Sequence, residues 1–172
     1  MNRTNIELGI QNSSTITLSC WSAGYCAIRA IISRHEDLIH NIILLDGLHA
    51  SYIPENQVLY DGGKIDSLRL NHFLEFAEKA VNGKKQMVIT HSSIFPGTYA
   101  STTESTEYLI RKLGIKRKPS LKPGPVGMQQ VGETISGKLV ILSFAGNTAP
   151  DHIDHLHGLY YFLDKIFTTR ND

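Results

Sequence analysis

Four runs of residues rich in Ile, Leu and Val divide this chain, and they constrain its fold more than any other feature. The runs are STITLSC at 14–20, NIILLDG at 41–47, QMVITHS at 86–92 and GKLVILSFAG at 137–146. None of them alternates cleanly between apolar and polar residues. Near-continuous apolar runs are typical of strands in a sheet that is covered on both faces.

Helical patterns lie between and after these runs. The spacing of apolar residues predicts helices over 23–35, 65–81, 103–113 and 151–167. Strands that alternate with helices predict an α/β fold, with a mostly parallel sheet and helices on both faces. The segment 115–136 is rich in Pro, Gly and Lys, and we expect it to form a long loop.

Length and charge narrow the class of protein. A chain of 172 residues suits one domain, so we expect residues 1–172 to fold as a single unit. The net charge of +1 argues against nucleic acid as a partner, and we interpret the basic run KRKP at 116–119 as a solvated loop. No apolar run approaches the roughly 20 residues of a membrane span, and no secretory signal is visible. With only Cys20 and Cys26, which we expect to be free thiols, the sequence favours a cytoplasmic protein.

The first run leads directly into the pentapeptide Cys20-Trp21-Ser22-Ala23-Gly24, which has the form small-x-Ser-x-Gly. A sharp turn from strand to helix exposes a serine hydroxyl and requires small residues two positions to either side. The N–H of Ala23, at the start of the following helix, would suit a developing oxyanion. The alternative is a structural serine at a helix N-terminus.

A serine hydroxyl needs a base, and the base needs an orienting acid. Asp46 ends the second run and would lie at the same edge of the sheet as Ser22, although it could also cap a turn. The last run is followed by His152 at a helix start, which we expect to be the base. His155, one turn further on, is the alternative base.

Further residues near these positions could line the same site: Trp21, Tyr25, His49 and His91. A metal site built from Asp151, His152, His155 and His157 is a competing reading of the same histidines. Because His155 and His157 point to different faces of the predicted helix, these ligands would not converge. We therefore expect no metal and no cofactor.

The segments CWSAGY around Ser22, LLDGLH around Asp46 and GNTAPDHIDHL around His152 resemble the α/β-hydrolase superfamily. The acid that follows the strand next to the nucleophile strand is similar to the lipase branch. The resemblance implies a serine hydrolase that cleaves a small ester-type substrate through Ser22, His152 and Asp46, with the Ala23 N–H as an oxyanion donor. It covers most of the chain and implies a partial hydrolase fold.

The resemblance also carries a departure. The superfamily has about four strands and a loop before the nucleophile strand, whereas only about 14 residues precede it here. The chain therefore resembles the C-terminal part of the fold, with one edge of the sheet open. We expect a homodimer or a complementing N-terminal chain to cover that edge, and we expect the isolated monomer to be weakly active or inactive. The alternative function is a non-catalytic, hydrolase-like half that binds a partner or dimerises across the edge.

Overall fold

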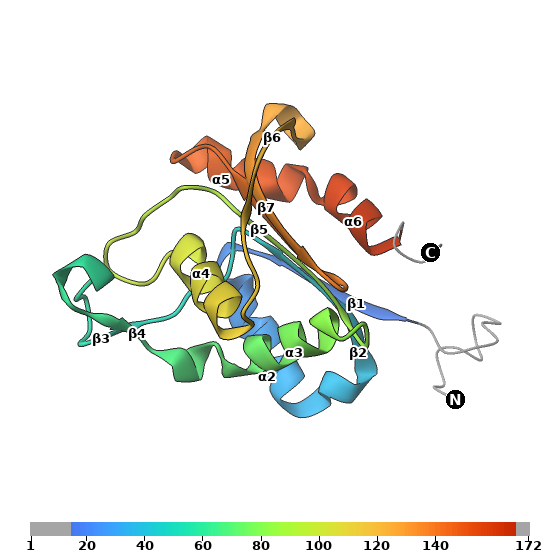
Figure 1. Ribbon diagram of the computed structural model, residues 1–172, viewed down its shortest axis with the longest axis horizontal. Coiled ribbons are helices and arrows are strands. Elements are labelled where there is room, and N and C mark those ends of the chain that lie inside the picture. The colour runs from blue at the N-terminus through green and yellow to red at the C-terminus, as the bar shows by residue number, and fades with distance from the viewer. Residues whose placement is uncertain (1–14, 168–172) are drawn as a thin grey trace.

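The computed structural model describes residues 15–167, and its centre is a mixed sheet of six strands in the order β1-β2-β5-β8-β7-β6 (Figure 1). A separate two-stranded sheet pairs β3 with β4. The strands are β1 Ile16–Trp21, β2 Ile39–Leu45, β3 Tyr52–Ile53, β4 Lys64–Ile65, β5 Gln86–His91, β6 Lys118–Pro123, β7 Gln129–Ser136 and β8 Leu139–Phe144. The helices are α2 Tyr25–His35, α3 Asn71–Val81, α4 Thr102–Lys112, α5 Ala149–His157 and α6 Leu159–Phe167. The predicted α/β class is confirmed.

The four apolar runs form the four parallel strands β1, β2, β5 and β8, as predicted. All residues of β5 and β8 are buried, and only His40 of β2 is exposed. This burial explains why the runs show no alternation. β1 is the exception, because it pairs with β2 alone within residues 15–167 and its residues are exposed or half-buried.

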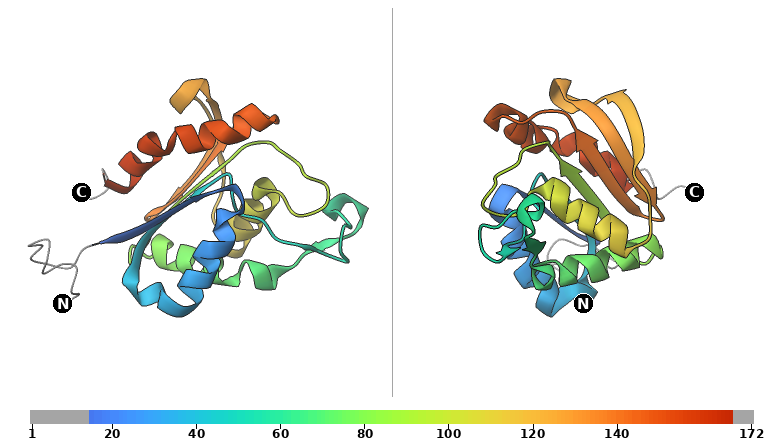
Figure 2. Two further views of the ribbon diagram at one scale, coloured as in Figure 1. Left: turned by 180° about the vertical axis from the view of Figure 1, so that it is seen from behind. Right: turned by 60° about the vertical axis from the view of Figure 1, so that its left-hand side comes forward.

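Helices cover both faces of the sheet, as predicted (Figure 2). On one face, α2, α3 and α4 contribute residues such as Ile32, Phe73 and Leu109 to the larger apolar core. On the other face, α6 buries Phe162 and Ile166 against β2, β5 and β8. Each such fully buried side chain contributes roughly 1.5–3 kcal/mol relative to an exposed one.

The predicted loop 115–136 is wrong, because this segment contains two strands: β6 pairs antiparallel with β7, and β7 pairs antiparallel with β8. The inward positions of β7 include Gln130, Gly132 and Thr134, so a polar set takes the place of the apolar residues that signal a strand. Pro119 and Pro123 lie in β6, which is the edge strand, where a missing N–H is tolerated.

Two predicted helices also differ from the structure. The helix predicted over 151–167 is two helices, α5 and α6, separated at Gly158. A Cβ at this glycine would lie 2.9 Å from the side chain of Pro125, so the break between the helices lies where the chain passes close to Pro125. The helix predicted over 65–81 begins only at Asn71, because Ile65 pairs in β4. Within residues 15–167, no helix combines the length and apolar character that a membrane crossing requires.

Candidate active site

Ser22 stands at a sharp bend between β1 and α2. A short 3-10 turn, Ser22–Gly24, joins the two elements, and Ser22 adopts a positive φ of 55°. A non-glycine residue in this region is strained, and such residues cluster at functional sites. A Cβ at Gly24 would lie 2.9 Å from the Cβ of Cys20. The expected need for a small residue two positions after the serine is therefore met.

Gly47, which follows the neighbouring strand β2, leaves room for the bend at Ser22. A Cβ at this position would lie 2.4 Å from the carbonyl oxygen of Ser22 and 2.7 Å from its nitrogen. Both of these atoms belong to the backbone, so no side-chain rotation could relieve the clash. The glycine after Asp46 thus allows the loop that follows β2 to pack directly against the backbone of Ser22.

We expect Gly47→Ala to lower the free energy of unfolding by about 2–3 kcal/mol, because the added methyl group forces the two backbones apart. Gly83→Ala is the matched control, since its φ is +74° and open space surrounds its Cβ position. We expect a loss of about 1 kcal/mol there, from conformation alone. Urea unfolding of both variants measures the difference, and equal losses would contradict the close-packing argument.

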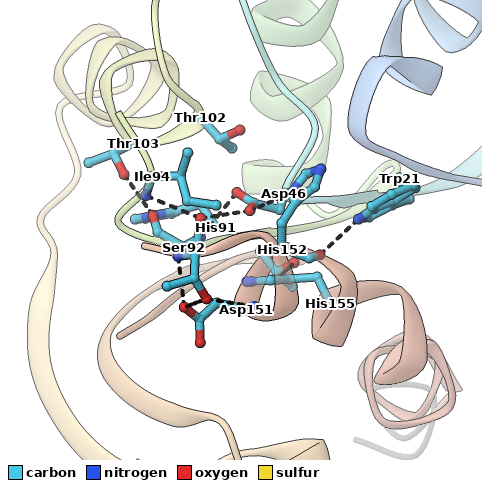
Figure 3. A network of polar contacts seen from close by, with 12 residues as sticks. Trp21, Asp46, His91, Ser92, Ile94, Thr102, Thr103, Asp151, His152 and His155 are labelled. Carbon is cyan, nitrogen blue, oxygen red and sulfur yellow. Dashed lines mark hydrogen bonds and ion pairs between the residues drawn. The ribbon is translucent and has the colours of Figure 1, made fainter. Parts of the chain in front are cut away.

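Asp46 occupies the carboxyl end of β2 and is only 4% exposed. Its own N–H donates to the carbonyl of Thr90, which fixes it beside the end of β5. Its Oδ1 accepts from the N–H of Ser92 at 3.1 Å, and its Oδ2 accepts from the Ser92 hydroxyl at 2.7 Å (Figure 3). Burial alone would raise the pKa of this carboxyl, but hydrogen bonds from His152 and Ser92 outweigh it and lower the pKa to about 2.

His152 lies in the first turn of α5 and faces Asp46. Its Nδ1 is 2.8 Å from Oδ2 of Asp46, which leaves Nε2 as the second functional nitrogen of the ring. The indole of Trp21 packs against the imidazole with ring centroids 4.6 Å apart. The indole N–H also donates to the carbonyl of His152 at 2.8 Å (Figure 3). The residue before Ser22 therefore holds the helix that carries the histidine.

The N-terminus of α5 is fixed by its own sequence. Thr148 and Asp151 form a reciprocal capping box, with Pro150 in the first turn. The Asp151 carboxylate accepts from the backbone N–H of Thr148 at 2.8 Å. These contacts set the point at which the helix begins, and hence the side to which His152 projects.

Ser22, Asp46 and His152 line one cavity of about 290 Å³, although they come from the ends of β1 and β2 and from α5. The three residues that the sequence predicted to work together thus line the same cavity, although no hydrogen bond joins Ser22 to His152 within residues 15–167. The remaining walls come from the loop after β2, from the segment between β5 and α4 with the first residue of α4, and from the loop before α5 with the first residue of α5. These residues are His49, Ile94, Pro96, Tyr99, Thr102, Asn147, Thr148 and Ala149.

The structure separates His155 from this cavity. His155 is 1% exposed, its Nδ1 is 2.7 Å from the hydroxyl of Thr90, and its ring packs between Phe144 and Phe162. Burial lowers its pKa to about 4, so the ring is neutral near pH 7. The alternative assignment of His155 as the base is therefore wrong on placement, since the residue does not reach the cavity.

The other predicted site residues divide into three groups. His49 lines the cavity, and Ala23 is the exposed residue directly after Ser22. Trp21 and Tyr25, which the sequence also predicted to line the site, do not line this cavity: Trp21 packs on His152, and Tyr25 packs on His49. His91 does not line this cavity: it is buried beside a neighbouring cavity of about 330 Å³. The prediction that His91 lines the site with Ser22 is wrong in that respect.

His91 instead belongs to a buried network that supports Asp46 from behind. Its Nδ1 is 2.9 Å from the carbonyl of Ser92, which also accepts from the Thr103 hydroxyl (Figure 3). Its Nε2 accepts from Arg117 Nη1 at 2.9 Å. Burial, together with the Arg117 cation, lowers the pKa of His91 to about 4. Arg117 lies within the run 116–119, so the interpretation of that whole run as solvated is wrong.

Ser92 is the functional residue that sequence reasoning missed, since it gives Asp46 two hydrogen bonds. Its signal was present, because it follows β5, which lies beside the strand of Asp46.

The competing metal site is not assembled. Within residues 15–167, no group of three His, Cys, Asp or Glu side chains could hold a metal ion.

Comparison of the chain with protein-family models, with curated proteins and with solved structures finds no match. What the protein does must therefore follow from the chemistry of its own residues. The arrangement offers a strained serine, an imidazole and a buried carboxylate around one small cavity.

Proposed function

We propose that the protein is a serine hydrolase of the α/β-hydrolase type that cleaves a small ester or a related acyl bond. The observation that carries this proposal is the 2.8 Å contact between His152 Nδ1 and Asp46, in a cavity that Ser22 also lines. The parallel pairing of β1 with β2 supports it, because the acid then follows the strand next to that of the nucleophile. In this proposal the chain carries part of a hydrolase fold.

In the first half of the reaction, Ser22 Oγ attacks the acyl carbonyl and His152 Nε2 takes the hydroxyl proton. Asp46 remains ionised and holds the Nδ1–H tautomer, for which its lowered pKa suits it. The oxyanion of the tetrahedral intermediate accepts from the N–H of Ala23, at the start of the turn into α2. His152 then returns its proton to the leaving alcohol, and the acyl group stays on Ser22.

In the second half, water attacks the acyl-Ser22 carbonyl while His152 takes a proton from the water. Collapse of the second tetrahedral intermediate releases the carboxylic acid, and His152 returns the proton to Ser22 Oγ. Loss of one hydrogen-bond donor to the oxyanion lowers the rate by a factor on the order of 10²–10³. Since the proposal assigns Ala23 as the only donor, we expect slow turnover by this chain alone.

Hydrolysis of p-nitrophenyl acetate and butyrate by the purified chain tests the proposal. We expect Ser22→Ala to remove the protein-dependent rate, a loss on the order of 10³-fold or more. Ser19→Ala is the matched control, since Ser19 lies three residues earlier on β1 and is exposed. A Ser22→Ala rate equal to that of the unmodified chain would overturn the assignment, as would a rate that Ser19→Ala abolishes equally.

Ser92→Ala gives a second prediction, because it removes one donor to Asp46 and keeps the backbone N–H contact. We expect a loss of about 1.5–3 kcal/mol in the free energy of unfolding at pH 7 and a fall of about tenfold in kcat/KM. Ser93→Ala, at the exposed neighbouring position, is the control and should change neither quantity. Restoration of the rate by Ser92→Thr would show that the hydroxyl matters; an unchanged rate in Ser92→Ala would exclude its role.

A second candidate function rests on β1, whose outer edge pairs with no other strand within residues 15–167. We propose, as the alternative, that this edge binds a second copy of the chain or a complementing chain, with or without catalysis. Unpaired strand groups template such pairing. Sedimentation of the purified chain separates the cases, because a monodisperse monomer speaks against pairing between copies.

We also infer a reducing, cytoplasmic location for the protein. Cys20 and Cys26 are both free thiols. Burial raises the pKa of Cys20 to about 12, so this thiol is protonated and unreactive near neutral pH. Free thiols of this kind persist in reducing compartments.

A further inference from the structure

His49 occupies a fixed place in the wall of the cavity that holds Ser22 and His152. It lies three residues after Asp46, in the loop that leaves β2. The next residue, Ala50, forms an isolated bridge with Ala100 and accepts from its N–H at 2.9 Å. The loop that carries His49 is thus tied to the segment that leads into α4.

The orientation of the His49 ring is set on three sides. Its Nδ1 is 3.2 Å from the carbonyl oxygen of Ala100. The ring meets Tyr25 edge to face at 5.5 Å and Tyr99 edge to face at 5.1 Å between centroids. A ring held in this way has little freedom to turn when a ligand enters.

This orientation decides the chemistry of the other ring nitrogen. A carbonyl oxygen can only accept, so Nδ1 of His49 carries the hydrogen. The ring is neutral at pH 8 even with an ordinary pKa, and burial lowers the pKa of His49 further. Nε2 is then a hydrogen-bond acceptor, and it has no hydrogen-bond partner among residues 15–167.

The other residues that line the cavity disfavour an anionic substrate. Ile94, Pro96 and Ala149 contribute apolar wall surface, and none of the residues within 15–167 that line the cavity is Lys or Arg. The one carboxylate, Asp46, already accepts from His152 and Ser92. An anionic substrate would meet no Lys or Arg side chain among these lining residues and would lie near the negative charge of Asp46. A volume of about 290 Å³ is at the lower limit for ligand pockets, so the ligand is small.

We propose that His49 is a specificity-determining residue that accepts a hydrogen bond from a hydroxyl or N–H group of the substrate. The preferred substrate is then a small acyl compound that is not anionic and that carries such a donor close to its scissile bond. This inference rests on the proposed hydrolase function. A substrate without the donor leaves Nε2 desolvated and unpaired, whereas a substrate with the donor satisfies it.

Matched esters test this directly. The quantities to measure are kcat/KM values for p-nitrophenyl butyrate and for its 2-hydroxy and 3-hydroxy analogues, at pH 8. We expect the unmodified chain to favour at least one hydroxylated ester by about 10- to 100-fold. His49→Phe keeps an aromatic ring against Tyr25 and Tyr99 but cannot accept, so the ratio should fall close to one. His49→Gln, whose side-chain carbonyl can accept, should retain part of the preference.

His72→Phe, at a half-buried histidine of α3 outside the cavity, is the matched control and should keep the full ratio. Thermal unfolding of each variant establishes that it is folded. If His49→Phe does not fold, the ester ratio of His49→Gln is compared with that of the unmodified chain instead. Equal rates for all three esters through Ser22 would overturn the role of His49 alone, as would a preference that survives His49→Phe. Rates that equal those of Ser22→Ala for every ester would instead overturn the hydrolase function, and the His49 proposal with it.

Discussion

Replacement of Asp46 by asparagine is expected to lower kcat/KM for ester hydrolysis by about 10⁴-fold. The substitution keeps the size of the side chain, so the backbone N–H of Ser92 can still donate to the remaining oxygen. The new amide group, however, donates towards His152 Nδ1, where the carboxylate accepted at 2.8 Å. His152 then takes the tautomer with its hydrogen on Nε2, and that nitrogen can no longer remove the proton of Ser22.

Asp154→Asn is the control for this prediction, because Asp154 lies on α5 near His157 and outside the cavity. We expect its kcat/KM to stay within about twofold of the unmodified chain, since no contact to the site changes. Initial rates with p-nitrophenyl butyrate measure both variants. An Asp46→Asn variant that is folded and keeps more than a tenth of the activity would show that Asp46 does not set the tautomer of the base.

The second large effect concerns stability against pH. We expect the free energy of unfolding to fall by about 3–4 kcal/mol between pH 7 and pH 5. The cause is the pair of buried neutral histidines, His91 and His155, whose pKa values are each lowered from 6.5 to about 4. Between these values the unfolded chain binds protons that the folded chain does not, so stability is full above pH 6.5 and is lost as the pH falls towards 4.

Asp46 acts in a lower pH range. Its folded pKa of about 2 lies below the ordinary value of 3.8, so its contribution is present above pH 3.8 and is lost as the pH falls towards 2. It therefore adds almost nothing to the change between pH 7 and pH 5. The lowered pKa of His49 acts in the same direction as those of His91 and His155.

Urea unfolding followed by the fluorescence of Trp21 measures this pH dependence. In His155→Phe the difference between pH 7 and pH 5 should fall to about half, whatever the change in absolute stability. His157→Gln, at the exposed histidine of the same helix, should keep the full difference. A difference below about 1 kcal/mol in the unmodified chain would contradict the neutral burial of His91 and His155.

The parallel part of the fold was predictable because its signal is local. β2, β5 and β8 are covered on both faces, so each had to be a continuous apolar run. The β6–β7 hairpin was not predictable on the same grounds, because its inward residues include Gln130 and Thr134, which bond or pack within the sheet. Their burial depends on partners that only the assembled sheet supplies.

The candidate site followed the same division. Ser22, Asp46 and His152 were predictable because parallel strands bring their carboxyl ends to one edge. The choice between His152 and His155 was not, since both lie on nearly the same side of one helix. Packing decides it, because Phe144 and Phe162 enclose His155 and leave His152 at the cavity.

The hydrogen-bond network behind Asp46 was the part of the site that the sequence predicted least. Arg117 comes from the segment before β6 and reaches His91 only because the hairpin folds back beside β8. His91 in turn contacts the carbonyl of Ser92, and the N–H of Ser92 donates to Asp46, so Arg117 is linked to Asp46 through these two residues. No local pattern in the run 116–119 indicates such a contact.

One measurement tests the central claim most directly: covalent labelling of the purified chain by a fluorophosphonate, followed by peptide mass mapping. We predict a single phosphonyl adduct, on the peptide that contains Ser22, absent from Ser22→Ala and formed far more slowly in His152→Ala. An adduct at another residue, or labelling that persists in Ser22→Ala, would contradict the account. So would a folded chain that the reagent leaves unmodified.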